Sequence, residues 1–311
     1  MSTDRLVSHQ LSTYYAPRGR QRIFDIGIQL SQIYLHPDDR LIGIMGDPGC
    51  GKSALVKGMF PGLELTNDDD GVNVRPLPLL DAGGFGFFKP HTYHVDIRFE
   101  QGFTQLSLLA DAILEAVHLG KRVVVEHFEL VYPLLPINAD LLIGIGEEIV
   151  VTRPSLLGPE PQEIYDMIHK SLPYRLMAHS AEDLCELFLP PEELERCSHG
   201  DIRHGFILYF PDTRPNVDIP ALEAKVREMI ALDLPITYAD ETHVTIGERR
   251  HRCTGPRTHV RSTGRIENFH LLYEPIYDRR NKRWLLLGSV GPESLESLKK
   301  LEQMQQKTAS M

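Results

Sequence analysis

Apolar and polar residues follow two alternating patterns along the first half of the chain. From residue 21 to 36, isoleucine and leucine recur at the three- and four-residue spacing of an amphipathic helix. Residues 41–45 form a short, continuously apolar segment, as in a strand buried on both faces. The same patterns recur later, with strands expected at 63–66, 122–126 and 141–145 and helices at 53–59 and 103–119. Strands that alternate with helices predict an α/β domain with a parallel sheet.

The pattern changes beyond residue 201. Residues 161–197 read as helix interrupted by prolines, and after them come a strand at 206–210, a helix at 221–232, several short strands and a polar C-terminal helix with an apolar stripe. This mixture predicts a smaller α+β domain. We therefore expect three parts, namely a flexible N-terminus (1–20), the parallel-sheet domain with a helical connector (21–201) and the α+β domain with its C-terminal helix (202–311).

Composition limits the class of protein. The chain has 311 residues, of which 42% are hydrophobic and 24% charged, as in soluble globular proteins with one large or two ordinary domains. No apolar stretch approaches the ~18 residues that a membrane span needs, and residues 1–19 contain no apolar signal segment. We therefore expect a cytoplasmic protein without a membrane partner. The four cysteines form no CxxC pair, which favours reduced thiols over a disulfide framework.

A phosphate-binding motif follows the strand expected at 41–45. Its residues fit the pattern G-x-x-x-x-G-K-S and are Gly46, Asp47, Pro48, Gly49, Cys50, Gly51, Lys52 and Ser53. Glycines let successive backbone N–H groups turn toward a phosphate, and the helix after them presents its N-terminus to the same group. The motif predicts a P-loop that binds a nucleoside triphosphate, with Lys52 on the β- and γ-phosphates and Ser53 on Mg²⁺. ATP is expected because no NKxD motif is present, since Asn281-Lys282 is followed by Arg283-Trp284.

Carboxylates after the expected strands are candidates for catalysis. Glu126 ends the strand at 122–126, where a carboxylate could reach Mg²⁺. Asp68, Asp69 and Asp70 follow the strand expected at 63–66, where one of them could accept the proton of a substrate hydroxyl. The aspartate run could instead be a solvated turn. Glu126 could instead be a carboxylate at an exposed strand end.

Together with the P-loop and the aspartate run, Lys-Arg-Val-Val-Val-Glu-His-Phe (121–128) resembles the uridine kinase and phosphoribulokinase group of P-loop kinases. The similarity covers about residues 40–150. It implies an ATP-dependent phosphotransferase for a small molecule, with Lys52, Asp68, Asp69 and Glu126 as catalytic residues. The lid of such kinases supplies arginines to the phosphates, whereas residues 165–186 contain only Arg175 and Lys170. Binding or hydrolysis of the nucleotide without a kinase reaction therefore remains an alternative.

A second group of chemically active residues lies in the α+β domain. His251, Cys253 and His259 place a thiol and two imidazoles within nine residues, a donor set that could bind Zn²⁺. If residues 244–246 and 251–253 form a hairpin, His251 and Cys253 project from one face and His243 from the other. The net charge of the chain is −10, but ten basic residues lie between Arg249 and Arg283. This basic segment could receive a polyanion such as tRNA, or form a solvated strand face.

The same segment resembles the second additional domain of threonyl- and alanyl-tRNA synthetases, the module that hydrolyses mischarged aminoacyl-tRNA. The matching residues are Gly247-Glu248, His251, Cys253, Gly255-Pro256, His259-Val260, Thr263-Gly264-Arg265-Ile266, Phe269 and Leu271. The similarity covers about residues 205–290. His251 replaces a carboxylate of the family, two residues are inserted between Cys253 and His259, and the family's helix with HxxxH is not apparent. His199, His204 and His243 are the nearest candidates for that helix's ligands.

Three hypotheses follow. The first is a kinase-like phosphotransferase that uses ATP and Mg²⁺ on an unknown small-molecule acceptor. The second is an aminoacyl-tRNA deacylase, or a tRNA-handling protein, whose nucleotide domain is regulatory. The third is a nucleotide-gated binding module without turnover. The first is favoured by the P-loop and by the positions of the carboxylates.

Overall fold

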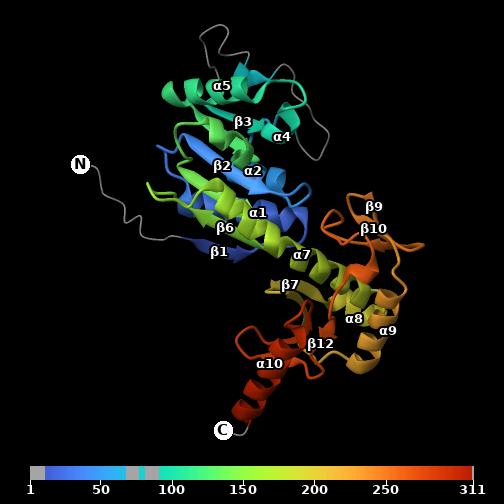
Figure 1. The fold of residues 1–311 in the computed structure, drawn as a ribbon. Helices are drawn as coiled ribbons and strands as arrows, with labels where there is room; N and C mark the ends of the chain where they lie inside the picture. The colour runs from blue at the N-terminus through green and yellow to red at the C-terminus, as the bar shows by residue number, and fades with distance from the viewer. Residues whose placement is uncertain (1–10, 68–76, 81–90, 310–311) are drawn as a thin grey trace. The chain divides into compact units, whose positions relative to one another are not determined.

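The computed structural model describes residues 11–67, 77–80 and 91–309, which form two compact units (Figure 1). The first unit comprises the described residues up to 16 together with 20–170, and the second comprises 17–19 together with the described residues from 171 onward. The sequence pattern placed the second domain from residue 202. The structure begins the second unit inside α7 (Pro161–Glu186), because the latter half of this helix packs into that unit's core.

A six-stranded sheet forms the centre of the first unit. Its strands are β1 (Ser12–Tyr15), β2 (Leu41–Gly46), β3 (Thr92–Asp96), β4 (Arg122–Glu126), β5 (Leu141–Ile145) and β6 (Glu148–Thr152), in the order β1-β6-β5-β2-β4-β3. Strands β5, β2, β4 and β3 are parallel, while β6 and β1 run antiparallel at one edge. The expected α/β class is confirmed, and the sheet, which was expected to be parallel, is mostly parallel.

Helices cover both faces of this sheet because successive side chains of a strand point to opposite faces. Ile42 and Ile44 of β2 pack with α1 and α2, whereas Leu41 and Met45 belong to the cluster that contains α5. The helical segments of this unit are α1 (Arg20–Tyr34), α2 (Lys52–Met59), α4 (Ile97–Glu100), α5 (Leu106–His118), α6 (Phe128–Val131), η1 (Tyr132–Leu134) and the first half of α7.

Three local features differ from the sequence-based expectations. Residues 63–66 form no strand, because the amide of Thr66 donates to the side chain of His94 at 3.1 Å instead of joining a ladder. Among the described residues, β3 is the next strand along the chain after β2, and neither β3 nor β6 was anticipated. Residues 12–15, expected within a flexible N-terminus, pair as β1 with β6.

Antiparallel sheets and four further helices form the described part of the second unit, in agreement with the expected α+β composition. One sheet has the order β12-β14-β8-β7, with β13 also paired to β14, and the other has the order β11-β10-β9. The strands are β7 (Ser198–Ile202), β8 (Gly205–Pro211), β9 (Ile236–Asp240), β10 (His243–Ile246), β11 (Arg249–Arg252), β12 (His270–Leu271), β13 (Ile276–Asp278) and β14 (Arg283–Ser289). The helices are α8 (Pro191–Arg196), α9 (Ile219–Ala231), η2 (Thr263–Arg265) and α10 (Ser294–Ala309).

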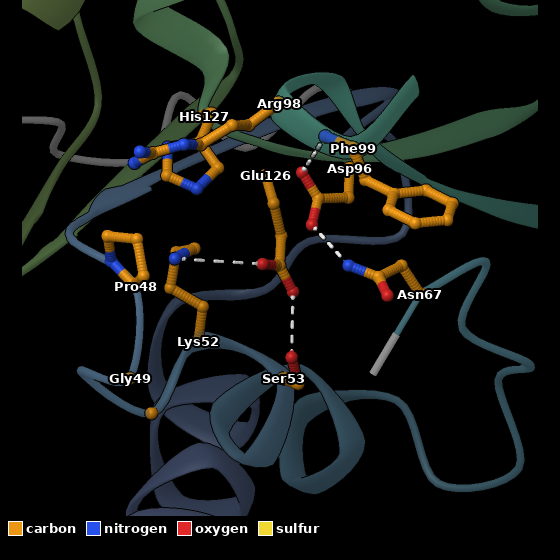
Figure 2. Close-up of a pocket in the computed structure, with 11 residues that line it drawn as sticks. Pro48, Gly49, Lys52, Ser53, Asn67, Asp96, Arg98, Phe99, Glu126 and His127 are labelled. Atoms are coloured by element: carbon orange, nitrogen blue, oxygen red, sulfur yellow. Dashed lines mark hydrogen bonds and ion pairs between the residues drawn. The ribbon is translucent and has the colours of Figure 1, made fainter. Parts of the chain in front are cut away.

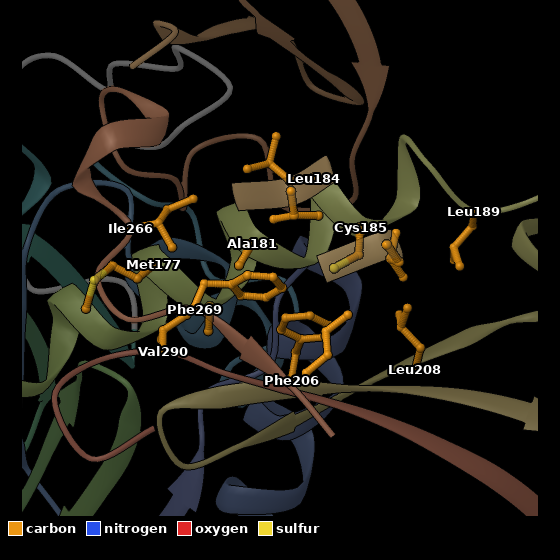
Figure 3. Packing of buried hydrophobic residues seen from close by; sticks show 14 of the residues in the cluster. Met177, Ala181, Leu184, Cys185, Leu189, Phe206, Leu208, Ile266, Phe269 and Val290 are labelled. Carbon is orange, nitrogen blue, oxygen red and sulfur yellow. The ribbon is translucent and has the colours of Figure 1, made fainter. Parts of the chain in front are cut away.

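The core of the second unit joins α7 to the larger sheet. Met177, Ala181 and Cys185 lie along one side of α7 and pack with Phe206 and Leu208 of β8 (Figure 3). This packing fixes the rotation of α7 about its axis and so determines where the polar residues between these positions point. Among the described residues, no helix combines the length and the apolar character needed to cross a membrane.

Candidate functional site

The glycine-rich segment 46–53 forms the turn between β2 and α2. Gly49 and Gly51 have φ angles of 79° and 105°, which side-chain-bearing residues rarely adopt. A Cβ at Gly51 would lie 2.5 Å from Cδ1 of Ile23, so that side chain would also have to shift. α2 begins at Lys52. The turn therefore brings the N-terminus of a helix, which carries partial positive charge, to the carboxyl end of the central strand.

A pocket of about 290 Å³ lies at this turn (Figure 2). Its polar lining includes Lys52, Ser53, Asn67, Asp96, Arg98 and Glu126. Asp96 and Glu126 end the parallel neighbours β3 and β4 and are partners in their register. Their carboxylates consequently face the pocket from the same edge of the sheet.

Lys52 is buried and its ammonium group lies within the turn. Nζ donates to the backbone oxygens of Gly46 at 3.1 Å and Asp47 at 3.3 Å, and lies 3.9 Å from Oε2 of Glu126. Burial alone would lower the pKa of Lys52, but electrostatic interactions with Cys50 and Glu126 outweigh burial and raise the pKa above its ordinary value. The pocket therefore holds a fixed positive charge.

Glu126 is held ionised by its neighbours. The Ser53 hydroxyl donates to Oε1 at 3.4 Å, and Nε2 of His94 lies 3.2 Å from the same oxygen. Because the Thr66 amide donates to Nδ1 of His94, the proton of a neutral His94 ring is on Nε2 and points at Glu126. Burial raises the pKa of Glu126, but the hydrogen bond from His94 and the charge of Lys52 lower it below its ordinary value.

Asp96 is a second oriented carboxylate, which the sequence analysis did not single out. Its Oδ1 accepts from the amide of Phe99 at 3.1 Å and so caps α4, and its Oδ2 accepts from Nδ2 of Asn67 at 2.9 Å. The available signal was the alternation Tyr93, His94, Val95, which predicts a short strand that ends at a carboxylate.

Asp47 is oriented by α7. Its carboxylate accepts from Oη of Tyr165 at 2.9 Å and lies 2.9 Å from Nδ1 of His169. Burial, followed by the hydrogen bond to Asp47, raises the pKa of Tyr165 to about 12. Through these two contacts, Asp47 connects the glycine-rich turn to α7 and stabilises the conformation of the turn.

The structure brings Lys52, Ser53 and Glu126 to one pocket, the three side chains that the sequence analysis placed on phosphate and Mg²⁺. Asp68, Asp69 and Asp70 lie outside the described residues. Asn67, the residue before them, does line the pocket.

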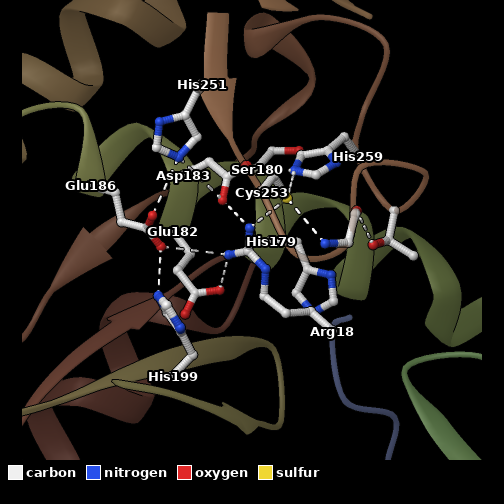
Figure 4. A network of polar contacts seen from close by, with 12 residues as sticks. Arg18, His179, Ser180, Glu182, Asp183, Glu186, His199, His251, Cys253 and His259 are labelled. Carbon is white, nitrogen blue, oxygen red and sulfur yellow. Dashed lines mark hydrogen bonds and ion pairs between the residues drawn. The ribbon is translucent and has the colours of Figure 1, made fainter. Parts of the chain in front are cut away.

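A second polar cluster lies wholly within the other unit (Figure 4). Arg18 is buried, and its guanidinium forms ion pairs with Glu182 and Asp183 of α7 and lies 3.9 Å from Glu186. Its Nη2 also donates to Sγ of Cys253 at 2.9 Å. One buried cation therefore faces three carboxylates and a thiol.

The hairpin β10–β11 and the loop after it bring histidines to this cluster. In the register of the hairpin, Val244 is opposite His251, which is buried, while Arg250 and Arg252 on either side of it are exposed. Nε2 of His251 lies 3.3 Å from Glu186. The expectation that His251 and Cys253 share a face agrees with this arrangement, because both are buried while Arg252 between them is exposed.

His259 follows in the same loop. Its Nε2 lies 2.9 Å from Oδ2 of Asp183 and 3.7 Å from Sγ of Cys253. Burial raises the pKa of Cys253 to about 12, so the thiol is protonated in this arrangement. Burial also raises the pKa of Asp183, but the Arg18 charge outweighs it and holds that pKa well below its usual range.

Of the three histidines considered as further ligands, only His199 joins this cluster. Nε2 of His199 lies 2.8 Å from Oε1 of Glu186. Burial lowers the pKa of His199, but hydrogen bonds with Cys197 and Glu186 raise it to about 10. His204 instead stacks on Tyr174, with ring centroids 3.8 Å apart. His243 pairs with Asp240 on the exposed side of the hairpin.

Asp183 and Arg18 were not expected at a site from the sequence pattern. Asp183 stands four residues after His179 on α7, which was read only as a helical connector. This spacing puts two polar side chains on one helix face and was an available signal. No local pattern marked Arg18, because its partners lie far away in the sequence.

Comparison with known proteins leaves the chain without an assigned family. No family model matches it, and no curated protein matches it. Among solved structures, a chain described as "Crystal structure of Bacillus subtilus YdiB" matches with 20% sequence identity and a TM-score of 0.29. The match covers 52% of this chain and 98% of that one. At this TM-score the similarity defines no shared fold and supports no function.

Proposed function

We propose that this chain is a P-loop protein that binds ATP with Mg²⁺ at residues 46–53 and transfers the γ-phosphoryl group to a small-molecule acceptor. The observation that carries the proposal is the pocket where buried Lys52 and two oriented carboxylates, Asp96 and Glu126, converge on a helix N-terminus. A cationic turn with backbone amides suits the phosphates, and carboxylates beyond it suit the metal and the acceptor.

The residues present fit a magnesium ion. Oγ of Ser53 and Oε1 of Glu126 lie 3.4 Å apart, and hydroxyl and carboxylate oxygens are ligands that Mg²⁺ prefers. Ser53 and Glu126 would hold the ion, which would offset the negative charge of the phosphates. Lys52 would bind the β- and γ-phosphate oxygens. His94 positions Glu126 by donating to it and keeps it ionised.

Asp96 is the base that the described residues offer, in the role that the sequence pattern suggested for one of Asp68, Asp69 and Asp70. It would accept the proton of the acceptor hydroxyl while that oxygen attacks the γ-phosphorus. The bond from the γ-phosphorus to the β-phosphate oxygen breaks, and ADP leaves. Arg98 is exposed at the pocket and would supply a further cation to the phosphates. Water as the acceptor would give simple ATP hydrolysis.

Calorimetric titration with ATP and Mg²⁺ tests the proposal. The native chain should bind, and Lys52→Ala should bind about 10- to 100-fold more weakly, because a buried charge-assisted hydrogen bond is removed. Lys300→Ala is the matched control, since Lys300 is exposed and pairs only with Glu296 among the described residues. A turnover assay against nucleosides, sugars and water then identifies the acceptor. Absence of binding by the native chain would reject the proposal.

The second candidate is an aminoacyl-tRNA deacylase or a tRNA-handling protein. It is favoured by the gathering of Cys253, His251 and His259 beside the carboxylates of α7. Incubation with mischarged threonyl- and alanyl-family tRNA tests it, with Cys253→Ser for comparison. Unchanged aminoacyl-tRNA after incubation with the native chain would remove this candidate.

A further inference from the structure

The second polar cluster contains a set of donors suited to a transition metal. Asp183, Cys253 and His259 each offer one ligand atom, and these atoms lie within 4.8 Å of one another. The separations include 3.7 Å from sulfur to nitrogen and 2.9 Å from nitrogen to carboxylate oxygen. Zinc bonds of about 2.0–2.3 Å bring neighbouring ligands of a tetrahedron to similar separations, and sulfur, nitrogen and oxygen are its usual donors. One ion could therefore be held by all three.

Arg18 engages two of these three residues. Its Nη2 pairs with Asp183 and donates to Sγ of Cys253 at 2.9 Å, while Nη1 pairs with Glu182. A metal ion bound to the same carboxylate and thiolate would meet a buried guanidinium at contact distance. Two like charges so close together and away from water repel strongly. Arg18 and a metal ion therefore cannot both be bound to Asp183 and Cys253.

The segment Pro17–Gly19 is held in place independently of the guanidinium. The backbone oxygen of Pro17 accepts from Nη2 of Arg175 at 3.0 Å, and the amide of Arg18 donates to Oδ1 of Asp201 at 3.3 Å. Gly19 has a φ of 89°, and a Cβ there would lie 3.2 Å from the side chain of Thr254. The backbone is thus fitted to deliver the side chain of residue 18 into the cluster.

We propose that Arg18 is a built-in cation that takes the place of a metal ion and closes a transition-metal site formed by Asp183, Cys253 and His259. The native chain then neutralises the carboxylates of α7 with its own arginine. Removal of that charge opens the three ligands to Zn²⁺. This inference does not depend on nucleotide binding in the other unit.

Zinc binding by the full-length chain and by Arg18→Met tests the proposal. Methionine keeps an unbranched side chain on the same backbone anchors and removes the charge. After equilibration with Zn²⁺ and desalting, Arg18→Met should retain about one ion per chain, with an affinity about 100-fold above that of the native chain, because two ligands are released from charge-assisted hydrogen bonds. Arg18→Met combined with Cys253→Ser should lose this gain. Arg18→Lys keeps a cation and should stay close to the native chain.

Circular dichroism of each variant, with and without Zn²⁺, separates metal binding from unfolding. If Arg18→Met unfolds without metal, Zn²⁺ should restore its fold, since binding free energy then adds to folding. Native protein that binds Zn²⁺ as tightly as Arg18→Met would overturn the proposal. So would an Arg18→Met variant that remains folded and gains no metal, or one that unfolds and is not restored.

Discussion

The His94–Glu126 contact is an example of how a single neighbour sets the charge of a buried residue. Glu126 is only 3% exposed, so burial favours its protonated form. The proton on Nε2 of His94 is directed at the carboxylate because Nδ1 already accepts from the Thr66 amide. The pKa of Glu126 is therefore lowered, and the side chain is ionised at neutral pH.

We predict that His94→Ala raises the pKa of Glu126, because a hydrogen bond that favours the carboxylate is removed. Proposed ATP turnover needs the ionised form, which disappears as pH falls through this pKa. The acidic limb of the pH–rate profile should move to higher pH, and turnover on that limb should fall about 10-fold, the effect of one hydrogen bond to a charged group.

His94→Gln provides the control, since its amide can place a donor near the position of Nε2. It should restore most of the native pH profile. An equal loss at every pH in both variants would show that His94 acts only through packing.

At the scale of elements, α1 and α2 approach each other unusually closely. An added Cβ at Gly58 would lie 2.1 Å from the backbone oxygen of Phe24, and one at Gly27 would lie 2.4 Å from that of Leu55. Glycine on both helices lets the backbones meet, and this packing supports α2, whose N-terminus forms part of the pocket.

Gly58→Ala should therefore lower the free energy of unfolding by about 2 kcal/mol or more, because the contacted atom is backbone and cannot move alone. Denaturant unfolding of the full-length chain measures the effect. Gly102→Ala is the control, since its added Cβ would lie 3.4 Å from the nearest atom, and it should change stability by less than about 0.5 kcal/mol. Equal losses of stability in the two variants would contradict the packing argument.

Helices and strands with a clear local pattern of apolar residues could be predicted from the sequence. Those with a less distinct pattern could not. The apolar run that precedes the glycine-rich turn became β2, and the periodic segment before it became α1. Residues 63–66 carried a strand-like pattern, yet Leu65 and Thr66 are buried without joining the sheet. Any buried segment is rich in apolar residues, whether or not it is a strand. A short apolar run therefore does not distinguish a strand from a buried irregular segment.

At the scale of the molecule, charge is distributed unevenly. The net charge is −10, and the basic segment 249–283 is the main exception. Within it, three arginines form intramolecular ion pairs at the surface: Arg250 with Asp240, Arg257 with Glu241, and Arg283 with Asp278. Arg249 and Arg252 of β11 are exposed. Only part of the basic segment is therefore available to a polyanion.

If RNA binds this segment, Arg249→Glu combined with Arg252→Glu should weaken binding of tRNA. The slope of log affinity against log salt should become shallower by about 2, one unit for each phosphate that an arginine no longer neutralises. Fluorescence anisotropy across a salt series measures both quantities. Arg257→Glu is the control and should have a smaller effect, because Arg257 already pairs with Glu241. Equal weakening by the double variant and the control would reject Arg249 and Arg252 as phosphate-binding residues.

The sequence by itself determined the glycine-rich turn, the helix after it, the α/β class and the inward face of the hairpin that carries His251. Each of these depends on interactions within a few residues, where glycine geometry and apolar spacing act. Tertiary structure alone decided that Asp96 joins Glu126 at one pocket and that Arg18 meets Asp183, 165 residues away along the chain. These side chains come together because of the strand order and the packing of α7, and no local pattern of residues specifies either.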